Sequence, residues 1–550
     1  MNNKFLDQKG KIILLGNEAV VRGALEAGIR FASNYPGTPA SEIGDTFAKI
    51  SKQSGVYFEQ SVNEKVAAEA AIGASLSGLK SMVSFKHFGL NVASDSLIPT
   101  AYIEPEAGFV IAFADDPNCW SSLQSEQDSR YYARIANIPM LEPSTPQECK
   151  DFTKLAFELS EKFKIPVFLR LTTRTCYTGG PVELKNYKIE KAKGKFNKNP
   201  EKFFTLAPRI IEIHKEVLSK LEKISDYLES SELNQVIDGK VSSDLGIIVS
   251  GVSYNYVLDA LAKYNTKAPI LKLGSTYPIP RKLISSFVKN KKNILVVEEL
   301  EPILETEARQ IAKDVNCDLM VHGKNILPRT GEYNSDLLEI AIGKLLGKKV
   351  SESKPRELKI PKRHPFFCPG CPHMATYTAV KQAAPDAIYG GDIGCYLMGI
   401  FPPYNTQDFI YDMGAGMGIS HGIKKATNQK IISFIGDSTF FHAGIPALIN
   451  MVYNKSNGLV IVLDNRITAM TGLQANPGMG LTATGEQTTE VKIEDIAKAV
   501  GVKHVKVVNA YDTKELAKTI KEFLAKNELA LIVSKGECAL LRKRKEAGNL

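Results

Sequence analysis

The sequence predicts an α/β protein with several doubly wound domains, each containing a parallel sheet. Short apolar runs rich in Ile, Val, Leu and Phe recur along the 550 residues and alternate with helical patterns. Runs of this kind are typical of strands buried on both faces of a parallel sheet. We expect such strands at 11–16, 80–85, 108–114, 165–171, 246–251, 293–299, 430–436, 458–464 and 529–534.

The length and the shifts in composition predict more than one core. We expect a first domain over 1–180, a linker over 181–242, a second domain over 243–348 and a third over 355–550. The linker begins with a lysine-rich segment and then contains an amphipathic helix starting near Pro208. Its apolar positions lie at three- and four-residue spacing, at Ile210, Ile213, Val217, Leu221, Ile224 and Leu228.

Composition excludes several classes of protein. With 44% hydrophobic and 23% charged residues, the chain has an ordinary globular composition. The net charge of +9 is spread along the chain apart from the basic segment "LLRKRKEAGNL", so we expect no nucleic-acid partner. We also expect no export signal and no membrane span, and we predict a cytoplasmic location. The eight cysteines in such a chain do not indicate a disulfide framework.

A metal-binding pattern follows two of the predicted strands. Gly436 and Asp437 follow the run 430–436, and Asn465 follows the run 458–464. The carboxyl ends of parallel strands are where α/β folds bind ligands, and Gly436 permits a tight turn there. Asp437 and Asn465 offer the oxygen ligands that Mg²⁺ prefers, and the carbonyl of Ile467 offers a third.

The spacing of this pattern resembles the signature of thiamine diphosphate-binding domains. In that signature Gly-Asp is followed after some 25 to 30 residues by Asn, and here 27 residues separate Asp437 from Asn465. Ser438 replaces the second glycine and Asp464 replaces the first of two asparagines, and neither change removes a magnesium ligand. We expect Gly436, Asp437, Ser438, Asn465, Ile467 and Thr468 to bind the cofactor with Mg²⁺. The alternative is an ordinary Gly-Asp turn.

Thiamine also requires a carboxylate beside N1′ of its aminopyrimidine. The first predicted domain offers Glu59, Glu64 and Glu69. Glu64 opens a helix of small residues between two predicted strands, so we expect it at the strand ends. Glu59 and Glu69 fit ordinary surface charges equally well.

The segment "HPFFCPGCPH" contains a second candidate site. Cys368 and Cys371 lie two residues apart among prolines and a glycine. Such a pair fits a metal or cluster ligand set, a redox dithiol, or only a tight turn.

Several segments together resemble the large (alpha) subunit of indolepyruvate ferredoxin oxidoreductase, a branch of the 2-oxoacid:ferredoxin oxidoreductases. They cover nearly the whole chain and include "NYPGTPASEI", "SVNEKVAAEAAIGASLSGLKSMVSFKHFGLNVASD", "EQDSRYYARIANIPMLEPSTPQE", "CPGCPH", "GDIGCY" and "GDSTFFHAGIPALINMVYN". The resemblance implies domains of thiamine diphosphate-binding type: a pyrimidine-binding domain at 1–180, a transketolase C-terminal-like domain at 243–348 and a diphosphate- and magnesium-binding domain at 355–550.

The resemblance implies a reaction and roles for residues. An arylpyruvate and coenzyme A would give an arylacetyl-CoA, CO₂ and two reduced ferredoxins. Glu64 would act at N1′, and Thr38 of "YPGTP" would lie near the substrate carboxylate. His87 and either Arg130 or Arg134 are candidate substrate-side groups.

The resemblance also implies a proximal [4Fe-4S] cluster. Its ligands would be Cys368, Cys371, Cys395 of "GDIGCY" and Cys538 of "KGECALL", separated in turn by gaps of 2, 23 and 142 residues. Four thiolates are what such a cluster requires. A Cys₄ zinc site and a redox dithiol remain alternatives. We expect structural roles for Cys119, Cys149, Cys176 and Cys317.

One departure concerns electron transfer. The large subunit of this family usually ends in a ferredoxin-like domain with two C-x₂-C-x₂-C-x₃-C-P runs, and the sequence to Leu550 contains neither. We expect either a longer chain or an electron exit on a ferredoxin or a ferredoxin-like subunit. The resemblance further implies a small (beta) subunit and paired heterodimers. The alternatives are a non-redox thiamine diphosphate-dependent 2-oxoacid decarboxylase and a non-catalytic scaffold subunit.

Overall fold

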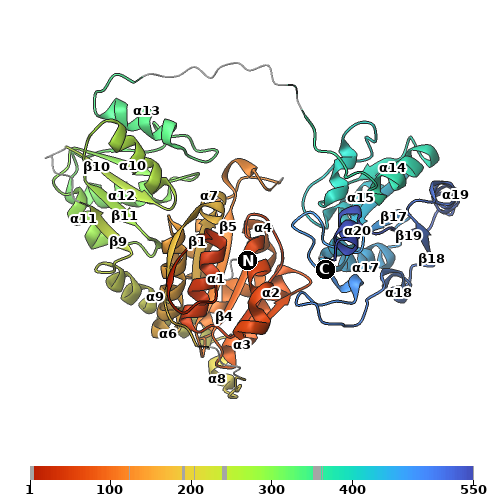
Figure 1. Ribbon diagram of the computed structural model, residues 1–550, viewed down its shortest axis with the longest axis horizontal. Helices are drawn as coiled ribbons and strands as arrows, with labels where there is room; N and C mark the ends of the chain where they lie inside the picture. The colour runs from red at the N-terminus through yellow and green to blue at the C-terminus, as the bar shows by residue number, and fades with distance from the viewer. Residues whose placement is uncertain are drawn as a thin grey trace. The chain divides into compact units, whose positions relative to one another are not determined.

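The chain folds into two compact units, Met1–Arg356 and Glu357–Leu550, coloured red to green and teal to blue in Figure 1. The structure is a computed structural model and describes residues 5–122, 124–188, 193–203, 205–237, 244–350, 361 and 363–548. Both units consist of strands that alternate with helices and pair mainly in parallel. The predicted α/β fold class is therefore confirmed.

A seven-stranded sheet forms the centre of the first unit. Its strands follow the order β12 (Ser275–Tyr277), β6 (Met140–Leu141), β7 (Val167–Thr172), β5 (Phe109–Asp115), β4 (Ser81–Lys86), β2 (Phe31–Asn34) and β3 (Tyr57–Gln60). All neighbours pair in parallel except β12, which runs antiparallel to β6. Every residue of β5 and β7 is buried, as expected for central strands covered by helices on both faces.

Helices lie between successive strands in this part of the chain. They are α1 (Gly16–Ala27), α2 (Ser41–Ser54), α3 (Glu64–Leu76), α4 (His87–Leu97), α5 (Arg130–Ala136), α6 (Pro146–Phe163) and α7 (Thr173–Tyr177). The side chain of Asn63 accepts a hydrogen bond from the Val66 N–H and so caps the start of α3. Helices α3, α4 and α7 begin at the carboxyl edge of the sheet, because they follow the ends of β3, β4 and β7.

The strand expected at 11–16 differs from the prediction. It forms β1 (Gly10–Leu15), which pairs antiparallel with β8 (Gly179–Leu184) in a separate two-stranded sheet. Ile12 and Leu14 are buried, whereas Ile13 between them is 65% exposed. A strand of this kind has one face toward solvent, so burial on both faces was the wrong expectation. The other eight predicted strands lie in the parallel sheets, as expected.

A five-stranded sheet completes the first unit. Its order is β14 (Met320–His322), β13 (Asn293–Val297), β10 (Leu245–Ser250), β11 (Ile270–Leu273) and β9 (Asn234–Ile237). Helices α10 (Ser253–Lys263) and α13 (Ser335–Leu345) pack on one face, and α11 (Arg281–Val288) and α12 (Ile303–Val315) on the other. The apolar residues of both faces form two separate cores.

The predicted amphipathic helix is α9 (Arg209–Leu228), which begins directly after Pro208. It buries Ile213, Val217, Leu221, Ile224 and Leu228. Strand β8 crosses the boundary expected at residue 180, and β12 from the later part of the chain joins the first sheet. The boundary expected at residues 242–243 and the start of the third domain expected at residue 355 lie outside the described residues. The division into four parts stays a prediction.

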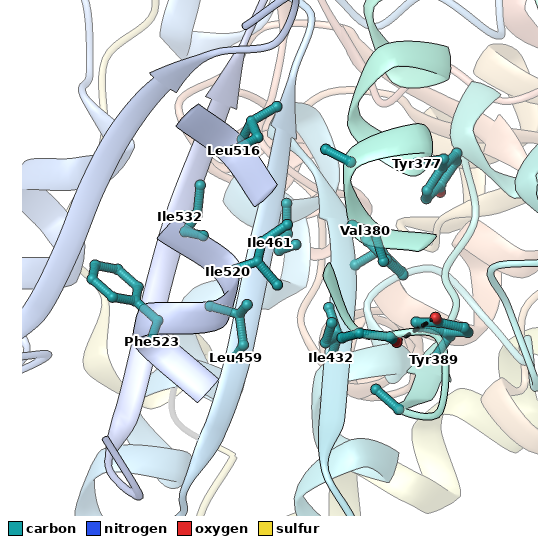
Figure 2. Close-up of a cluster of buried hydrophobic side chains, with 14 of the residues drawn as sticks. Tyr377, Val380, Tyr389, Ile432, Leu459, Ile461, Leu516, Ile520, Phe523 and Ile532 are labelled. Carbon is teal, nitrogen blue, oxygen red and sulfur yellow. Dashed lines mark hydrogen bonds between the residues drawn. The ribbon is translucent and has the colours of Figure 1, made fainter. Parts of the chain in front are cut away.

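The second unit contains a fully parallel five-stranded sheet. Its order is β15 (Ile388–Gly390), β16 (Ile431–Gly436), β17 (Gly458–Asp464), β19 (Leu529–Lys535) and β18 (His504–Asn509). Helices α14 (Pro372–Ala383) and α19 (Thr513–Leu524) cover one face. Figure 2 shows the apolar core between them and the sheet, where Val380 and Ile520 face Ile432 and Ile461. Helices α15 (Ala415–Ala426), α17 (Ile445–Tyr453) and α18 (Ile493–Ala499) cover the other face.

Across the described part of the chain, no helix is both long and apolar enough to cross a membrane.

Candidate active site

The carboxyl edge of the second unit's sheet brings two predicted magnesium ligands to adjacent strands. Asp437 directly follows β16, and Asn465 directly follows β17. Asp437 is only 4% exposed. Its Oδ1 accepts a hydrogen bond from the Ser438 N–H at 2.8 Å, and its Oδ2 accepts one from Nδ2 of Asn476 at 3.1 Å. Asn476, which the sequence did not single out, therefore orients this carboxylate.

A second carboxylate, that of Asp464, lies beside Asp437. Burial and the neighbouring charge of Asp464 together raise the pKa of Asp437. Both effects favour a proton on this pair. A divalent cation can take the place of such a proton, because it stabilises both carboxylates at once. This donor set fits Mg²⁺.

Gly436 is needed for a different reason from the one the sequence suggested. Its φ is −79°, a conformation open to any residue, so a tight turn does not require glycine here. A Cβ at position 436 would instead lie 2.6 Å from Cε1 of Tyr396. A Cβ at Gly394 would lie 2.3 Å from the same atom. Both glycines make room for the ring of Tyr396, which is buried.

The loop after β17 folds back toward Asp437. Oδ1 of Asn465 accepts a hydrogen bond from the Ile467 N–H at 3.1 Å. The hydroxyl of Thr468 donates to the Ser438 hydroxyl at 2.9 Å. The residues predicted to bind the cofactor, which come from two separate motifs, are therefore brought together.

The four predicted cluster cysteines all belong to the second unit. The Cys371 N–H donates to the Cys368 carbonyl at 3.0 Å, and Gly370 between them has a φ of +77°. Pro369 and Gly370 are the residues that a type II turn favours at its two central positions. Burial, together with the charges of Cys538 and Cys368, raises the pKa of Cys371 to about 11. The three thiols thus influence one another electrostatically.

Cys395 completes this group of thiols. Burial, together with the charges of the other three cysteines and of Asp437, raises its pKa to about 12. Thiols with such pKa values are protonated at neutral pH, and a metal or a cluster stabilises the thiolate form. The donor set thus fits an iron–sulfur cluster. Among the described residues, however, no three His, Cys, Asp or Glu side chains are grouped so as to hold a single metal ion as they stand.

Cys538 connects the cysteine group with the magnesium loop. Its N–H donates to the Asn465 carbonyl at 3.0 Å, and its side chain packs with Ile467 and Leu541. Cys538 precedes helix α20 (Ala539–Glu546). One predicted cluster ligand, Cys538, therefore contacts the loop that contains predicted diphosphate ligands. All eight cysteines are free thiols, and Cys149 and Cys176 lie in the core.

His373 is a site residue that the sequence analysis missed. It lies in the first turn of α14, is 2% exposed and places Nε2 3.4 Å from Nδ2 of Asn465. Burial lowers its pKa to about 4, so the ring is neutral. Its position two residues after Cys371, in "CPGCPH", was the available signal.

The first unit separates the three glutamate candidates by burial. Glu64, the first residue of α3, is 5% exposed. Glu59 accepts hydrogen bonds from Tyr57 and Ser61 on the strand β3, and Glu69 is exposed and pairs with Lys65. Only Glu64 lies inside the carboxyl edge of the sheet.

Glu64 packs against the first turn of α4. A Cβ at Gly89 would lie 2.6 Å from Cγ and 3.0 Å from Oε1 of Glu64, so glycine is required there. The N-terminus of α4 carries a partial positive charge, which favours a nearby carboxylate. His87 opens the same helix, and Thr38 lies in the loop after the neighbouring strand β2. Thr38, Glu64 and His87 therefore belong to one edge of the sheet.

The His87 side chain is fully buried. Its Nδ1 lies 3.1 Å from the Ala114 carbonyl, which can only accept, so Nδ1 carries the hydrogen. Burial lowers the pKa of His87, and the ring is neutral. Its Nε2 has no hydrogen-bond partner within the described residues and is an available acceptor.

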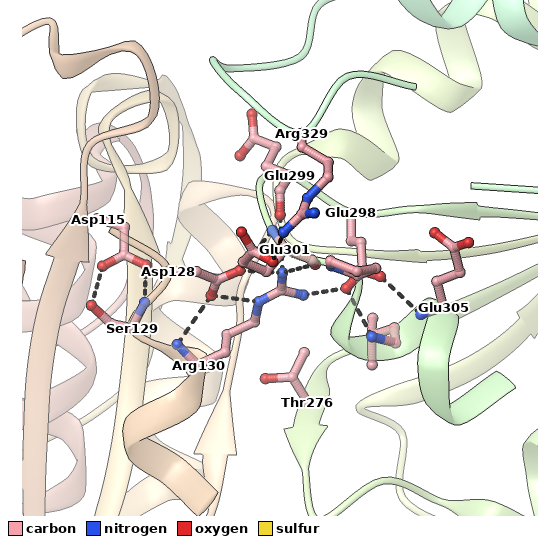
Figure 3. Close-up of polar contacts among 12 residues, drawn as sticks. Asp115, Asp128, Ser129, Arg130, Thr276, Glu298, Glu299, Glu301, Glu305 and Arg329 are labelled. Carbon is pink, nitrogen blue, oxygen red and sulfur yellow. Dashed lines mark hydrogen bonds and ion pairs between the residues drawn. The ribbon is translucent and has the colours of Figure 1, made fainter. Parts of the chain in front are cut away.

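Arg130 lies among protein groups between the two large sheets of the first unit. Its guanidinium is 3% exposed and bonds to the carboxylates of Asp128 and Glu298 and to the carbonyls of Glu299 and Glu301. Figure 3 shows this network, in which Glu298 follows β13. These contacts favour a packing role for Arg130 rather than a substrate contact.

Arg134 lies farther along α5. It pairs with Glu307 at 2.6 Å and is 39% exposed, and its guanidinium lies over the Tyr277 ring. The structure therefore holds both arginine candidates in ion pairs.

Two regions of the chain, each containing one of these sites, match known protein families. Residues 22–223 match the family described as "Pyruvate flavodoxin/ferredoxin oxidoreductase, thiamine diP-bdg". Residues 392–534 match "Thiamine pyrophosphate enzyme, C-terminal TPP binding domain". Glu64 lies in the first match, and Asp437 and Asn465 lie in the second.

Comparison with curated proteins covers nearly the whole chain. The "Indolepyruvate oxidoreductase subunit IorA" of Methanothermobacter thermautotrophicus is 47% identical over 96% of this chain and 87% of that protein. The protein of the same name from Thermococcus kodakarensis is 45% identical over 97% of this chain and 86% of its own length. That from Archaeoglobus fulgidus is 42% identical over 100% of this chain and 90% of its length.

Proposed function

Because this chain belongs to the family of the indolepyruvate oxidoreductase subunit IorA, we propose that it catalyses the thiamine diphosphate-dependent oxidative decarboxylation of arylpyruvates such as indolepyruvate. The observation that carries the proposal is that this chain contains both a buried Glu64 in one thiamine-type domain and the Asp437–Asn465 motif in another. The 2-oxoacid would lose CO₂ and two electrons, its acyl group would pass to the sulfur of coenzyme A, and one proton would be released. Two ferredoxins would each accept one electron.

The residues of the second unit would hold the diphosphate end of the cofactor. Asp437, Asn465 and the carbonyl of Ile467 would bind Mg²⁺, with Gly436, Ser438 and Thr468 beside the diphosphate. When bound, thiamine diphosphate supplies the electron sink for loss of CO₂. Asn476 and His373 would orient Asp437 and Asn465, because they contact these side chains directly.

The residues of the first unit would act on protons and on the substrate. Glu64 would hold a proton at its carboxylate during cofactor activation, a role that its burial against Gly89 supports by fixing the side chain. His87 would accept a hydrogen bond at Nε2, and Thr38 would donate one from its hydroxyl. Thr38 follows β2, Glu64 follows β3 and His87 follows β4, so all three residues lie at the carboxyl edge of the sheet.

Cys368, Cys371, Cys395 and Cys538 would ligate a [4Fe-4S] cluster. The charges of these cysteines raise one another's pKa values, which supports a common site. The backbone hydrogen bond between Cys538 and Asn465 supports a short path for electrons from the cofactor to the cluster. Electrons would then leave singly to a ferredoxin or a ferredoxin-like subunit. We also propose a small (beta) subunit and a paired assembly, because the relatives are named as subunits.

A reconstitution experiment tests this function. The chain would be co-expressed with its small subunit, purified anaerobically and supplied with Mg²⁺, thiamine diphosphate, coenzyme A and ferredoxin. We expect indolepyruvate-dependent ferredoxin reduction with formation of indoleacetyl-CoA. Formation of indoleacetaldehyde without ferredoxin reduction would identify a non-redox decarboxylase, and the absence of both products with bound cofactor would contradict catalysis on this substrate.

A further inference from the structure

We propose that the ammonium group of Lys86 binds the carboxylate of the 2-oxoacid substrate. This inference rests on the proposed function and adds the residue that would recognise the anionic end of the substrate. Lys86 is the last residue of β4, between the loop that contains Thr38 and the start of α4. It therefore lies on the same edge of the sheet as Glu64 and His87.

The side chain of Lys86 packs on the Thr38 loop. A Cβ at Gly37 would lie 2.8 Å from Cγ and 3.1 Å from Cδ of Lys86. The aliphatic part of the lysine thus packs directly on the backbone before Thr38. A side chain at position 37 would have to displace it, so glycine at this position keeps the contact.

The ammonium at the end of this side chain is not neutralised by a direct ion pair. Its closest polar contact is Oε1 of Gln124 at 3.4 Å, and it lies 5.0 Å from the centre of the Phe88 ring. Among the described residues, no carboxylate oxygen lies within 4 Å of it. A half-buried ammonium with one long neutral contact and one aromatic contact can accept an anionic ligand.

Two carboxylates act on Lys86 from a greater distance. They are Glu64 and Asp116, and both oppose the effect of burial, which lowers the lysine pKa. Asp116 is already satisfied, because its Oδ2 accepts from the N–H groups of Ser121 and Ser122 and its Oδ1 from the Thr173 hydroxyl. Glu64 packs on Gly89. Among the described residues, neither carboxylate forms a hydrogen bond or a direct ion pair with Lys86.

The arginines near this edge are already paired with carboxylates, so Lys86 is the cation best suited to bind the substrate carboxylate. Each arginine near this edge is held in an ion pair: Arg130 with Asp128 and Glu298, Arg134 with Glu307, Arg170 with Asp115 and Glu142, and Arg174 with Glu332. A substrate carboxylate at Lys86 would lie next to Thr38, and the Phe88 ring would offer an apolar surface beside it. An anionic end next to an aromatic group is the chemistry of an arylpyruvate.

The test replaces the charge and keeps the packing. Lys86→Met retains the aliphatic chain over Gly37, Lys86→Arg restores a cation, and Lys65→Met removes an exposed lysine beside Glu64 as the control. Each variant would be assayed as the holoenzyme with its small subunit. The readouts are KM and kcat for indolepyruvate and the dissociation constants of indolelactate, tryptophol and thiamine diphosphate.

We expect Lys86→Met to raise KM and to weaken indolelactate binding by about 10- to 100-fold, because one charge-assisted hydrogen bond is lost. Binding of uncharged tryptophol and of thiamine diphosphate should stay unchanged. Lys86→Arg should recover at least part of the loss, and Lys65→Met should resemble the wild type.

Four results would overturn the proposal. If the wild type is active and Lys86→Met has unchanged KM and indolelactate binding, the role of Lys86 is refuted and the proposed function is not. Equal losses for indolelactate and tryptophol, or loss of thiamine diphosphate binding, would show that the lysine acts on packing or on Glu64. A cofactor-loaded wild type that neither converts nor binds arylpyruvates would refute the proposed function and this inference together.

Discussion

Asp437 and Asp464 lie at the ends of neighbouring strands β16 and β17, close enough for the charge of Asp464 to raise the pKa of Asp437. Oδ1 of Asp464 accepts a hydrogen bond from the backbone N–H of Arg466 at 3.0 Å. The pKa of Asp464 itself is raised by burial. Two buried carboxylates at adjacent strand ends are the feature that best supports the proposed cation site.

Replacing one of these carboxylates tests the metal site. We expect Asp437→Asn to reduce magnesium-dependent binding of thiamine diphosphate by at least about 100-fold, because even groups outside the metal's own ligands are worth 10- to 100-fold. Calorimetric titration of the cofactor with and without Mg²⁺ measures this. Asp495→Asn, which alters an exposed aspartate of the same unit, is the control. Unchanged binding by Asp437→Asn would remove Asp437 from the site.

The buried Glu64 tests proton transfer. We expect Glu64→Gln to lower kcat by about 100- to 10,000-fold, the usual contribution of one acid–base group, while KM changes little. Glu69→Gln changes an exposed carboxylate on the same helix and should leave turnover intact. Steady-state kinetics with saturating thiamine diphosphate would compare them. Full turnover by Glu64→Gln would assign the role to another residue.

The close approach of Gly436 to Tyr396 makes a stability prediction. Gly436→Ala places a methyl group 2.6 Å from the ring, and we expect a loss of about 1–3 kcal/mol in the free energy of unfolding. Gly418→Ala is the matched control, because a Cβ there meets nothing within 4 Å and alanine favours the helix α15. Thermal unfolding distinguishes the two variants. Equal melting temperatures would show that the ring moves aside without cost.

Glu299 predicts a pH dependence of stability in the first unit. Burial raises its pKa from 4.5 to about 7, although the Tyr333 N–H donates to its Oε1 at 2.8 Å. Between these two values the folded chain binds more protons than the unfolded chain. The free energy of unfolding should therefore fall as pH rises from 4.5 to 7, by up to about 3 kcal/mol, and change no further above pH 7 from this group.

Glu299→Gln isolates that contribution. The amide can still accept from Tyr333 and cannot ionise, so the fall between pH 4.5 and 7 should be smaller in the variant by the amount that Glu299 contributes. Denaturant unfolding at several pH values measures the difference. Parallel pH profiles for the variant and the wild type would mean that Glu299 is ionised throughout this range.

Periodic features were predictable from the sequence because they depend on local chemistry. Eight of the nine expected strands lie in parallel sheets, and α9 starts directly after Pro208 and buries its apolar stripe. Strand β1 was misjudged because pairing with β8, some 170 residues later, sets which face is exposed. The alternation of buried Ile12 and Leu14 with exposed Ile13 is visible only once that partner is known.

The candidate site was predictable where spacing carries the information. The motif from Asp437 to Asn465 and the four cysteines follow from spacing and resemblance. The supporting contacts depend on tertiary packing: His373 on Asn465, Asn476 on Asp437 and Tyr396 against Gly436. For the same reason the sequence favoured Arg130 for the substrate, although an ion pair with Glu298 of the other sheet already holds it, and it gave no prominence to Lys86.

The most direct test is electron paramagnetic resonance of the anaerobic holoenzyme after addition of substrate. We predict about four irons per chain beyond those of any ferredoxin partner, and a reduced-cluster signal that appears with indolepyruvate and coenzyme A only when Mg²⁺ and thiamine diphosphate are present. Cys371→Ser should lose this iron, whereas Cys317→Ser, at an exposed position, should keep it. Zinc in place of iron, or decarboxylation with no reduced cluster, would contradict the account.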